Sequence, residues 1–307
     1  MINVLISVNH SYLPHAQVML KSLISNTKEK VSVYLLNHEL GEEDVSWLDT
    51  WIQSQKCVLH AIDVSRTDLD GLPTCPGQFS IEMYYRIIAQ YILPAQLDRV
   101  LWLDSDIVIL KDLSSFYYQD FDNNCLVACP DRNACSDFIY KIKKKVGIGY
   151  EHVYFNSGVL LLNLELLRNT YSFLEISSAI VNMQDLLTYP DQDFLNYAYQ
   201  GKVKYCDWKK YNYQINLDRR IRGDRLKKVS VLHYTGFHKP WLYRYLNSLS
   251  IYYWRIARIL GREGEFKSFL IKGILFWPVE QIRELPFRLK SFLSRHFVSC
   301  LKKRKML

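Results

Sequence analysis

Residues 99–110 read RVLWLDSDIVIL, and this stretch sets two carboxylates between two strongly apolar runs. The first run, residues 99–103, predicts a buried strand that ends at Asp104. Carboxylates in such a place need a cation or several hydrogen-bond donors to offset their desolvation. Two carboxylates spaced i, i+2 can hold one divalent cation, with a diphosphate supplying further oxygens. We interpret Asp104 and Asp106 as a metal site; a structural turn at a strand end is the alternative.

The spacing alone is not specific. Three other pairs share it, Asp68/Asp70, Asp120/Asp122 and Asp191/Asp193. The first two pairs lie in polar turns, where solvated aspartates are common. The third pair follows Pro190 and opens a predicted helix, so helix capping alone would account for Asp191. The apolar surroundings therefore distinguish the pair at 104 and 106 from the others.

The first hundred residues alternate short apolar runs with helical patterns. Strands are predicted at residues 2–8, 31–36, 57–64 and 99–103, and helices at residues 14–25, 42–55 and 81–92. This alternation indicates a parallel sheet flanked by helices, in which ligands bind beyond the carboxyl ends of the strands. Later strands are predicted at residues 125–129, 158–164 and 229–233, and residues 207–228 are predicted to form an irregular insertion over the active face.

The charge of the chain is concentrated at one end. Residues 283–307 contain eight basic residues against Glu284 alone, a net charge of +7 out of +8 for the whole chain. A nearly neutral body argues against a nucleic-acid-binding domain, which would carry a basic face within its fold. The seven cysteines include no CxxC pair, so reduced thiols are expected rather than a disulfide framework or a zinc ribbon.

The basic segment also carries an apolar stripe. Its members recur every four residues, at Leu285, Leu289, Leu293, Phe297 and Leu301. An apolar stripe beside dense cations is typical of a helix lying in an anionic membrane surface. An ordinary docked helix with a solvated charged end is the alternative. The first residues lack the features of a signal peptide, and no uncharged apolar run approaches the ~20 residues of a membrane span. We expect a cytoplasmic protein, peripheral on the inner face of the cell membrane.

Five motifs in order carry a family resemblance. They are Tyr85-Arg86, Leu103-Asp104-Ser105-Asp106, Phe155-Asn156-Ser157-Gly158, Asp191-Gln192-Asp193 and residues 233–241, HYTGFHKPW. Together they resemble glycosyltransferase family 8, retaining sugar transferases that include bacterial lipopolysaccharide galactosyl- and glucosyltransferases. The resemblance covers about residues 1–245. It implies a GT-A fold, a Rossmann-like mixed sheet flanked by helices, with residues 246–307 as a helical extension that ends in the basic tail.

The same resemblance implies a UDP-sugar donor, a glycan or glycolipid acceptor, and Mn²⁺, with Mg²⁺ as a possible substitute. Asp104, Asp106 and His233 would ligate the metal, and mixed oxygen and imidazole ligation suits Mn²⁺. The residues expected to bind the donor are Ser7, Val8, Asn9, Tyr12, Arg86, Asp104, Ser105, Asn156, Asp191, Gly236 and Lys239. Within this set, Lys239 and the backbone near Gly236 would hold the diphosphate.

The resemblance also assigns a catalytic group, Asp191, Gln192 and Asp193. Gln192 would lie close to the anomeric carbon and offer its carbonyl oxygen, with Asp193 behind it. Glutamine is a poor covalent nucleophile compared with the paired carboxylates of retaining glycosidases. We therefore expect same-face attack by the acceptor, and a covalent route through Asp193 is the alternative. One departure is Asn9 at a position where the family often has an Asp, so an amide replaces an acidic contact to the nucleoside.

Two other functions are considered. A nucleotidyltransferase can share a similar sheet and metal site, but residues 9–11, NHS, offer no basic loop for a triphosphate. The chain also lacks GxxxxGK[ST] and GxGxxG motifs, which argues against P-loop and dinucleotide enzymes. The second alternative is an inactive, membrane-bound module that binds a sugar nucleotide. The intact set of Asp104, Asp106, His233 and Lys239 argues against that possibility.

Overall fold

The computed structural model describes residues 1–64, 81–215, 223–237, 239–243 and 248–275 of the 307-residue chain. The chain divides into two compact units, Met1–Gly236 and Phe237–Leu307, which are described separately here. Residue 245, where the sequence suggests that the transferase domain ends, lies within the second unit.

The first half of the first unit alternates strands and helices as predicted. The elements are β1 (Ile2–Ser7), a 3-10 turn (His10–Tyr12), α1 (Leu13–Asn26), β2 (Val31–Asn37), α2 (Glu42–Ser54), β3 (Val58–Asp63), a 3-10 turn (Ile81–Tyr84), α3 (Tyr85–Ile92) and β4 (Arg99–Leu103). Pro14 stands in the first turn of α1, where its missing N–H costs nothing. The helix predicted at residues 81–92 begins as a 3-10 turn and becomes α-helical at Tyr85.

The second half is more varied. It contains β5 (Ile107–Ile109), α4 (Ser114–Tyr117), β6 (Leu126–Pro130), α5 (Asp137–Val146), β7 (Phe155–Asn163), α6 (Leu164–Thr170), α7 (Phe173–Met183), a 3-10 turn (Gln184–Leu186), α8 (Pro190–Ala198), β8 (Val203–Tyr205), α9 (Trp208–Tyr211), β9 (Tyr213–Gln214), a 3-10 turn (Gly223–Lys228) and β10 (Val231–His233). The strand predicted at residues 158–164 ends one residue early because the Asn163 side chain accepts a hydrogen bond from Leu166 N and caps α6.

A seven-stranded sheet runs in the order β3-β2-β1-β4-β7-β6-β8. The pairs β3/β2, β2/β1, β1/β4 and β6/β8 are parallel, whereas β7 is antiparallel to both β4 and β6. The predicted mixed sheet flanked by helices is confirmed. Because β1 and β4 are parallel neighbours, the segments that follow Ser7 and Leu103 leave the sheet at the same edge.

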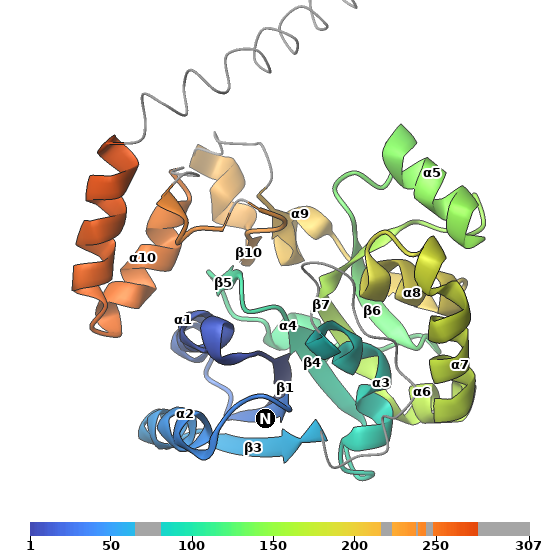
Figure 1. Ribbon diagram of the computed structural model, residues 1–307, viewed down its shortest axis with the longest axis horizontal. Coiled ribbons are helices and arrows are strands. Elements are labelled where there is room, and N and C mark those ends of the chain that lie inside the picture. The colour runs from blue at the N-terminus through green and yellow to red at the C-terminus, as the bar shows by residue number, and fades with distance from the viewer. Residues whose placement is uncertain (65–80, 216–222, 238, 244–247, 276–307) are drawn as a thin grey trace, which may run out of the picture. The chain divides into compact units, whose positions relative to one another are not determined.

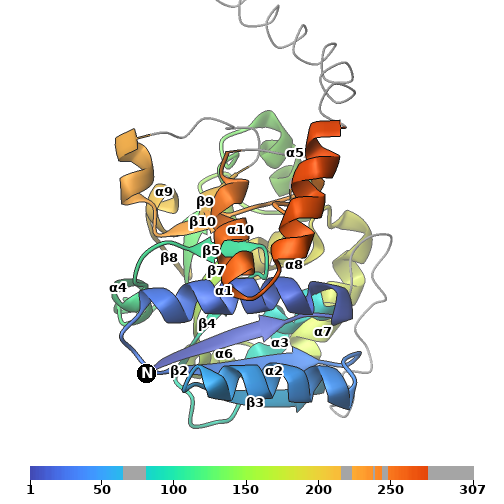
Figure 2. The same cartoon turned by 90° about the vertical axis from the view of Figure 1, so that its left-hand side faces the viewer.

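Strand residues alternate between two buried clusters, one on each face of the sheet. Leu5 and Trp102 face the cluster that includes side chains from α3, α5, α6, α7 and α8. Val4 and Leu103 face the cluster that includes side chains from α1 and α2. Figure 1 shows α3, α6 and α7 on one side of the sheet, and Figure 2 shows α1 and α2 lying along β1, β2 and β3 on the other.

A second, three-stranded sheet has the order β5-β10-β9. Its β5 strand follows β4 after three residues, and β10 pairs with β5 in antiparallel register, with His233 opposite Ile107. The strand predicted at residues 229–233 is thus shorter, and it belongs to this separate sheet. The predicted irregular insertion at residues 207–228 contains α9 and β9, and residues 216–222 lie outside the described residues.

The second unit is helical where it is described. Helix α10 (Ser250–Ile259) buries Tyr253, Trp254 and Ala257, and the Trp254 ring lies 4.9 Å from the Phe269 ring. Trp254 Nε1 donates to the carbonyl oxygen of Pro240 at 3.0 Å, which ties α10 to the start of this unit. Among the described residues, no helix combines the length and apolar character that crossing a bilayer requires. The predicted membrane-surface helix at residues 283–307 lies outside the described residues.

Candidate active site

Asp104, Asp106 and His233 meet at the edge where β4 leaves the large sheet. Asp104 follows β4, Asp106 precedes β5, and the β5/β10 pairing brings His233 beside them. His233 Nε2 lies 3.2 Å from Asp106 Oδ1 and 3.7 Å from Asp104 Oδ2. One ligand atom from each residue lies within 4.8 Å of the others. The structure therefore brings together the three residues expected to bind a metal.

A chain of hydrogen bonds fixes the tautomer of His233. The backbone N–H of Gly158 donates to Asn156 Oδ1 at 3.1 Å, which identifies that atom as oxygen. Asn212 Nδ2 donates to the same oxygen at 2.8 Å, so Asn212 turns its own oxygen to His233 Nδ1, also at 2.8 Å. Nδ1 of His233 must then carry the proton. The lone pair of Nε2 in the neutral ring faces the two carboxylates, and only a proton or a cation between them makes that arrangement favourable.

Gly158 leaves the space in which these three side chains meet. A Cβ atom at this position would stand 2.2 Å from His233 Cε1, 2.7 Å from Asp104 Oδ2 and 2.9 Å from His233 Nε2. Gly158 O also accepts a hydrogen bond from Asp104 N at 3.0 Å, which places the backbone of β7 directly against the acidic turn. Two carboxylates and an imidazole in a compact, mostly buried group match the ligands that a borderline divalent cation prefers. The residues fit such an ion.

Arg86 links the acidic turn to α8. Its guanidinium lies 3.0 Å from Asp104 Oδ1 and 3.2 Å from Asp191 Oδ2, and it donates to Ser157 O at 3.0 Å. The group also stacks on the Trp102 ring, 4.4 Å from its centroid. Arg86 is only 9% exposed, so it is a buried group and not a cation on the outer face of the helix. Buried beside two carboxylates, it restrains their positions through direct ion pairs.

The carbonyl oxygen of Gln192 points into the protein. It accepts a hydrogen bond from Asn156 Nδ2 at 2.9 Å and one from Ser157 N at 3.1 Å. Both lone pairs of this oxygen are therefore engaged. The Gln192 side chain also makes a hydrogen bond to Asp131, whose pKa is raised by burial in spite of that bond. Because the oxygen of Gln192 is taken, its amide N–H is the donor to Asp131.

Asp193 is fully buried at the start of α8. Its Oδ2 accepts hydrogen bonds from Thr188 N at 2.6 Å and Tyr189 N at 2.9 Å, and its Oδ1 accepts one from the Tyr154 hydroxyl. Burial raises the pKa of Asp193. Its contacts satisfy two backbone N–H groups of the segment that leads into α8. In this conformation the carboxylate does not reach the surface, which argues against the covalent route through Asp193.

The other residues expected to bind the donor are distributed as follows. Ser7 ends β1, and Val8 and Asn9 follow it. Asn9 Oδ1 accepts from Tyr12 N at 3.2 Å and from Ser11 Oγ at 2.8 Å. Tyr12 is 37% exposed. Ser105 stands between the two aspartates and is partly exposed. Gly236 has a φ of +69°, a conformation that favours glycine, at the end of the first unit. Lys239 belongs to the second unit.

Three residues at this site were not expected from the sequence. Asn212 lies in the irregular segment before β9, and only the hydrogen bond to His233 identifies its role. Asp131 follows β6, and a carboxylate after a buried strand is the signal that would have found it. Trp102 lies within β4 and donates from Nε1 to Asp104 Oδ1 at 2.9 Å.

Comparison with known families and proteins gives consistent matches. The family model of glycosyl transferase family 8 matches residues 3–244. A Haemophilus influenzae protein described as a glycosyltransferase is 28% identical over 250 residues, covering 78% of this chain and 72% of the relative. The lipopolysaccharide 1,2-glucosyltransferase of Escherichia coli K12 is 24% identical over 266 residues, covering 83% of this chain and 77% of the relative.

Among solved structures, the galactosyltransferase LgtC in complex with donor and acceptor sugar analogues aligns with a TM-score of 0.72 at 23% identity. The alignment covers 83% of this chain and 95% of that chain. This likeness confirms the predicted GT-A architecture.

Proposed function

The chain belongs to glycosyltransferase family 8, as its motifs indicate, and we propose that it is a retaining, manganese-dependent hexosyltransferase. The proposed donor is a UDP-sugar, with glucose or galactose favoured, and the proposed acceptor is a hydroxyl of a lipid-linked or cell-surface glycan. The observation that carries the proposal is the convergence of Asp104, Asp106 and His233 around the space that Gly158 leaves open.

The ion would be held by Asp104, Asp106 and His233. Their mixture of oxygen and nitrogen ligands favours Mn²⁺ over a purely oxygen-loving ion, with Mg²⁺ as a possible substitute. When bound, the ion supplies a Lewis acid that stabilises negative charge on the departing diphosphate. Asn212 keeps the Nε2 lone pair of His233 directed at the ion site, because Asn212 Oδ1 accepts a hydrogen bond from the opposite ring nitrogen, Nδ1.

The donor sugar would lie against Arg86, Asn156 and Asp191. The network around Arg86 supports this role, because its partners hold the guanidinium in one orientation before any ligand arrives. Such preorganisation lowers the cost of ordering side chains on binding. Ser157 Oγ donates to Asp191 Oδ2 at 2.8 Å, so this carboxylate too is held in place.

The leaving diphosphate would be met by Lys239 and by backbone groups near Gly236. A cation placed where negative charge develops in the transition state contributes to catalysis directly. The nucleoside would be contacted by Ser7, Val8, Asn9 and Tyr12. Ser7 ends β1 and the other three follow it, at the edge of the sheet where Asp104 follows β4. Ser105, between the two acidic ligands, would contact the diphosphate.

Retention would follow from attack on the same face of the sugar. The acceptor oxygen forms the new bond to the anomeric carbon as the bond to the phosphate oxygen breaks. The acceptor proton passes to the leaving phosphate. The burial of Asp193 and the engaged oxygen of Gln192 both support a route without a covalent intermediate. Gln192 would then position the sugar through its amide edge, with Asp131 as the acceptor of its N–H.

The acceptor would be a lipid-linked glycan at the inner face of the cell membrane, with lipopolysaccharide favoured. This part rests on the names of relatives such as the lipopolysaccharide 1,2-glucosyltransferase of E. coli. The basic segment 283–307 would bind anionic lipid, since clustered basic residues gain about 1 kcal/mol each near such a surface. Deleting residues 283–307 should release the protein from anionic liposomes, and continued sedimentation with them would contradict this role.

The test is donor hydrolysis and transfer with the full chain. The protein is incubated with Mn²⁺ and a panel of UDP-sugars, and the release of UDP is measured. We expect release from UDP-glucose or UDP-galactose that requires the ion and that is lost in Asp104→Asn and Asp106→Asn, with the circular dichroism spectrum unchanged. Release at the wild-type rate in both variants would overturn the proposal. A matched control is Asp120→Asn, which makes the same chemical change in an exposed turn.

A further inference from the structure

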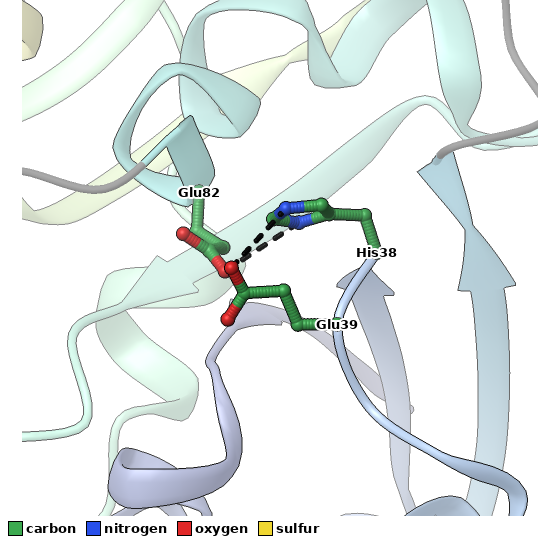
Figure 3. A group of neighbouring side chains, drawn as sticks. All are labelled: His38, Glu39 and Glu82. Atoms are coloured by element: carbon green, nitrogen blue, oxygen red, sulfur yellow. Dashed lines mark ion pairs between the residues drawn. The ribbon is translucent and has the colours of Figure 1, made fainter. Parts of the chain in front are cut away.

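A second group of possible metal ligands lies beside the carboxyl end of β2. It consists of His38 and Glu39, which follow β2, and Glu82, in the 3-10 turn before α3. One ligand atom from each residue lies within 4.8 Å of the others. Figure 3 shows both carboxylates converging on the imidazole of His38. The group shares no residue with the set of Asp104, Asp106 and His233.

Glu82 is the observation that points to a ligand. Its side chain is only 6% exposed, and neither of its oxygens has a hydrogen-bond partner among the described residues. A buried carboxylate without donors is strongly destabilising unless a cation compensates it. The nearest candidate for that compensation is His38, whose Nδ1 lies 3.5 Å from Glu82 Oε1.

The distances match ligands around an ion better than a direct ion pair. Charge-assisted N–H···O bonds measure about 2.7–2.9 Å. His38 makes one contact through each ring nitrogen: Nδ1 lies 3.5 Å from Glu82 Oε1, and Nε2 lies 3.5 Å from Glu39 Oε1. Two ligands that each lie about 2.1 Å from a common tetrahedral ion are separated by roughly 3.4 Å. Each ring nitrogen and the carboxylate oxygen nearest to it therefore stand at the spacing of two ligands on one ion, and one ligand atom from each of the three residues lies within 4.8 Å of the others.

We propose that His38, Glu39 and Glu82 form a second divalent-cation site. One imidazole nitrogen and two carboxylates select a borderline cation such as Mn²⁺ or Zn²⁺. Three protein ligands leave at least one coordination position for water. Glu39 is 55% exposed and His38 is 28% exposed at the side chain, so an ion can enter from solvent.

The site would tie the loop after β2 to the turn that begins α3. Arg86, one helical turn beyond Glu82, holds both Asp104 and Asp191. An ion at Glu82 therefore anchors the helix end that presents Arg86 to the active site. The proposed role of the second ion is structural, because none of His38, Glu39 and Glu82 takes part in the proposed reaction.

The test counts ions bound to the full-length protein. Apo protein is titrated with Mn²⁺, and free Mn²⁺ is measured by its electron paramagnetic resonance signal. We expect two ions per chain in the wild type, one in the Asp104→Asn/Asp106→Asn double variant, one in Glu82→Gln, and none when all three substitutions are combined. Glu43→Gln removes a charge from an exposed neighbouring position and should still bind two.

Thermal unfolding gives a second readout. Saturating Mn²⁺ should raise the Tm of the Asp104→Asn/Asp106→Asn variant, and adding Glu82→Gln should remove that rise. If Glu82→Gln does not fold, Glu39→Gln, at an exposed position, replaces it. This variant should lower the Mn²⁺ affinity of the second site at least tenfold. A folded Asp104→Asn/Asp106→Asn variant that binds no ion would overturn this proposal and leave the proposed function intact. Two ions in folded Glu82→Gln would overturn it as well.

Discussion

Replacing Gly158 with Ala tests how the metal ligands are packed. The added Cβ would stand 2.2 Å from His233 Cε1, whereas carbon atoms in contact prefer about 3.5–4.0 Å. Something must move by more than about 1 Å. His233 is 2% exposed and is held by Asn212, so it cannot rotate away into solvent. The backbone of Gly158 needs no left-handed conformation, so the effect is steric rather than a strain of the main chain.

Two magnitudes follow from that displacement. Overpacking of this kind costs about 1–3 kcal/mol of unfolding free energy, which lowers Tm by roughly 2–12 °C in a unit of this size. A shift of about 1 Å in a positioned group costs on the order of 100-fold in rate. We expect Gly158→Ala to lose at least tenfold in Mn²⁺ affinity and about 100-fold in kcat, measured by calorimetric titration and by UDP release.

The matched control is Gly264→Ala, the same chemical change where no atom lies within 4 Å of the added Cβ. That variant should bind Mn²⁺ and release UDP like the wild type. If Gly158→Ala also kept wild-type ion affinity and turnover, the packing of Asp104 and His233 described here would be wrong.

Three further predictions concern the groups around the ion site. Asn212→Ala should weaken Mn²⁺ binding by about 10- to 100-fold, because His233 loses the acceptor that fixes its tautomer; calorimetric titration checks this, and an unchanged affinity would contradict the role. Gln192→Ala should lower kcat strongly with a modest change in donor KM, and unchanged turnover would remove Gln192 from the mechanism. Asp193 has a raised pKa in the folded state, so its protonated form is favoured by folding. Protonated Asp193 contributes to the free energy of unfolding at a pH below the ordinary Asp pKa of about 3.9. This contribution is lost as the pH rises through the raised pKa of the folded state. Urea unfolding between pH 3 and pH 7 should show this loss in the wild type relative to Asp193→Asn, and parallel curves would refute it.

The large sheet could be read from the sequence because its signals are local. Apolar runs such as residues 99–103 alternate with helical patterns, and β4 begins and ends where they predict. The apolar runs on either side of Asp104 and Asp106 are also a local signal, so the sequence alone distinguishes this acidic pair from the others. A mixed sheet was implied by the family resemblance, but the residues did not show that β7 is the reversed strand, because strand direction depends on pairing between segments that are distant in sequence.

The site was only partly predictable. His233 entered through the family resemblance, since a single histidine at a strand end does not reveal a ligand. The role of Asn212 could not be predicted, because it depends on the register between β9 and β10. The orientation of the Gln192 amide could not be predicted either. It is set by two donors from another strand, Asn156 Nδ2 and Ser157 N, which bind its oxygen.

The proposed reaction requires one cation between Asp104, Asp106 and His233. Crystals of the protein grown with Mn²⁺ and UDP, measured at a wavelength where manganese scatters anomalously, test it directly. We expect an anomalous difference peak within about 2.0–2.3 Å of all three side chains, in contact with the diphosphate. A map with no peak among these side chains, while UDP is bound nearby, would contradict it.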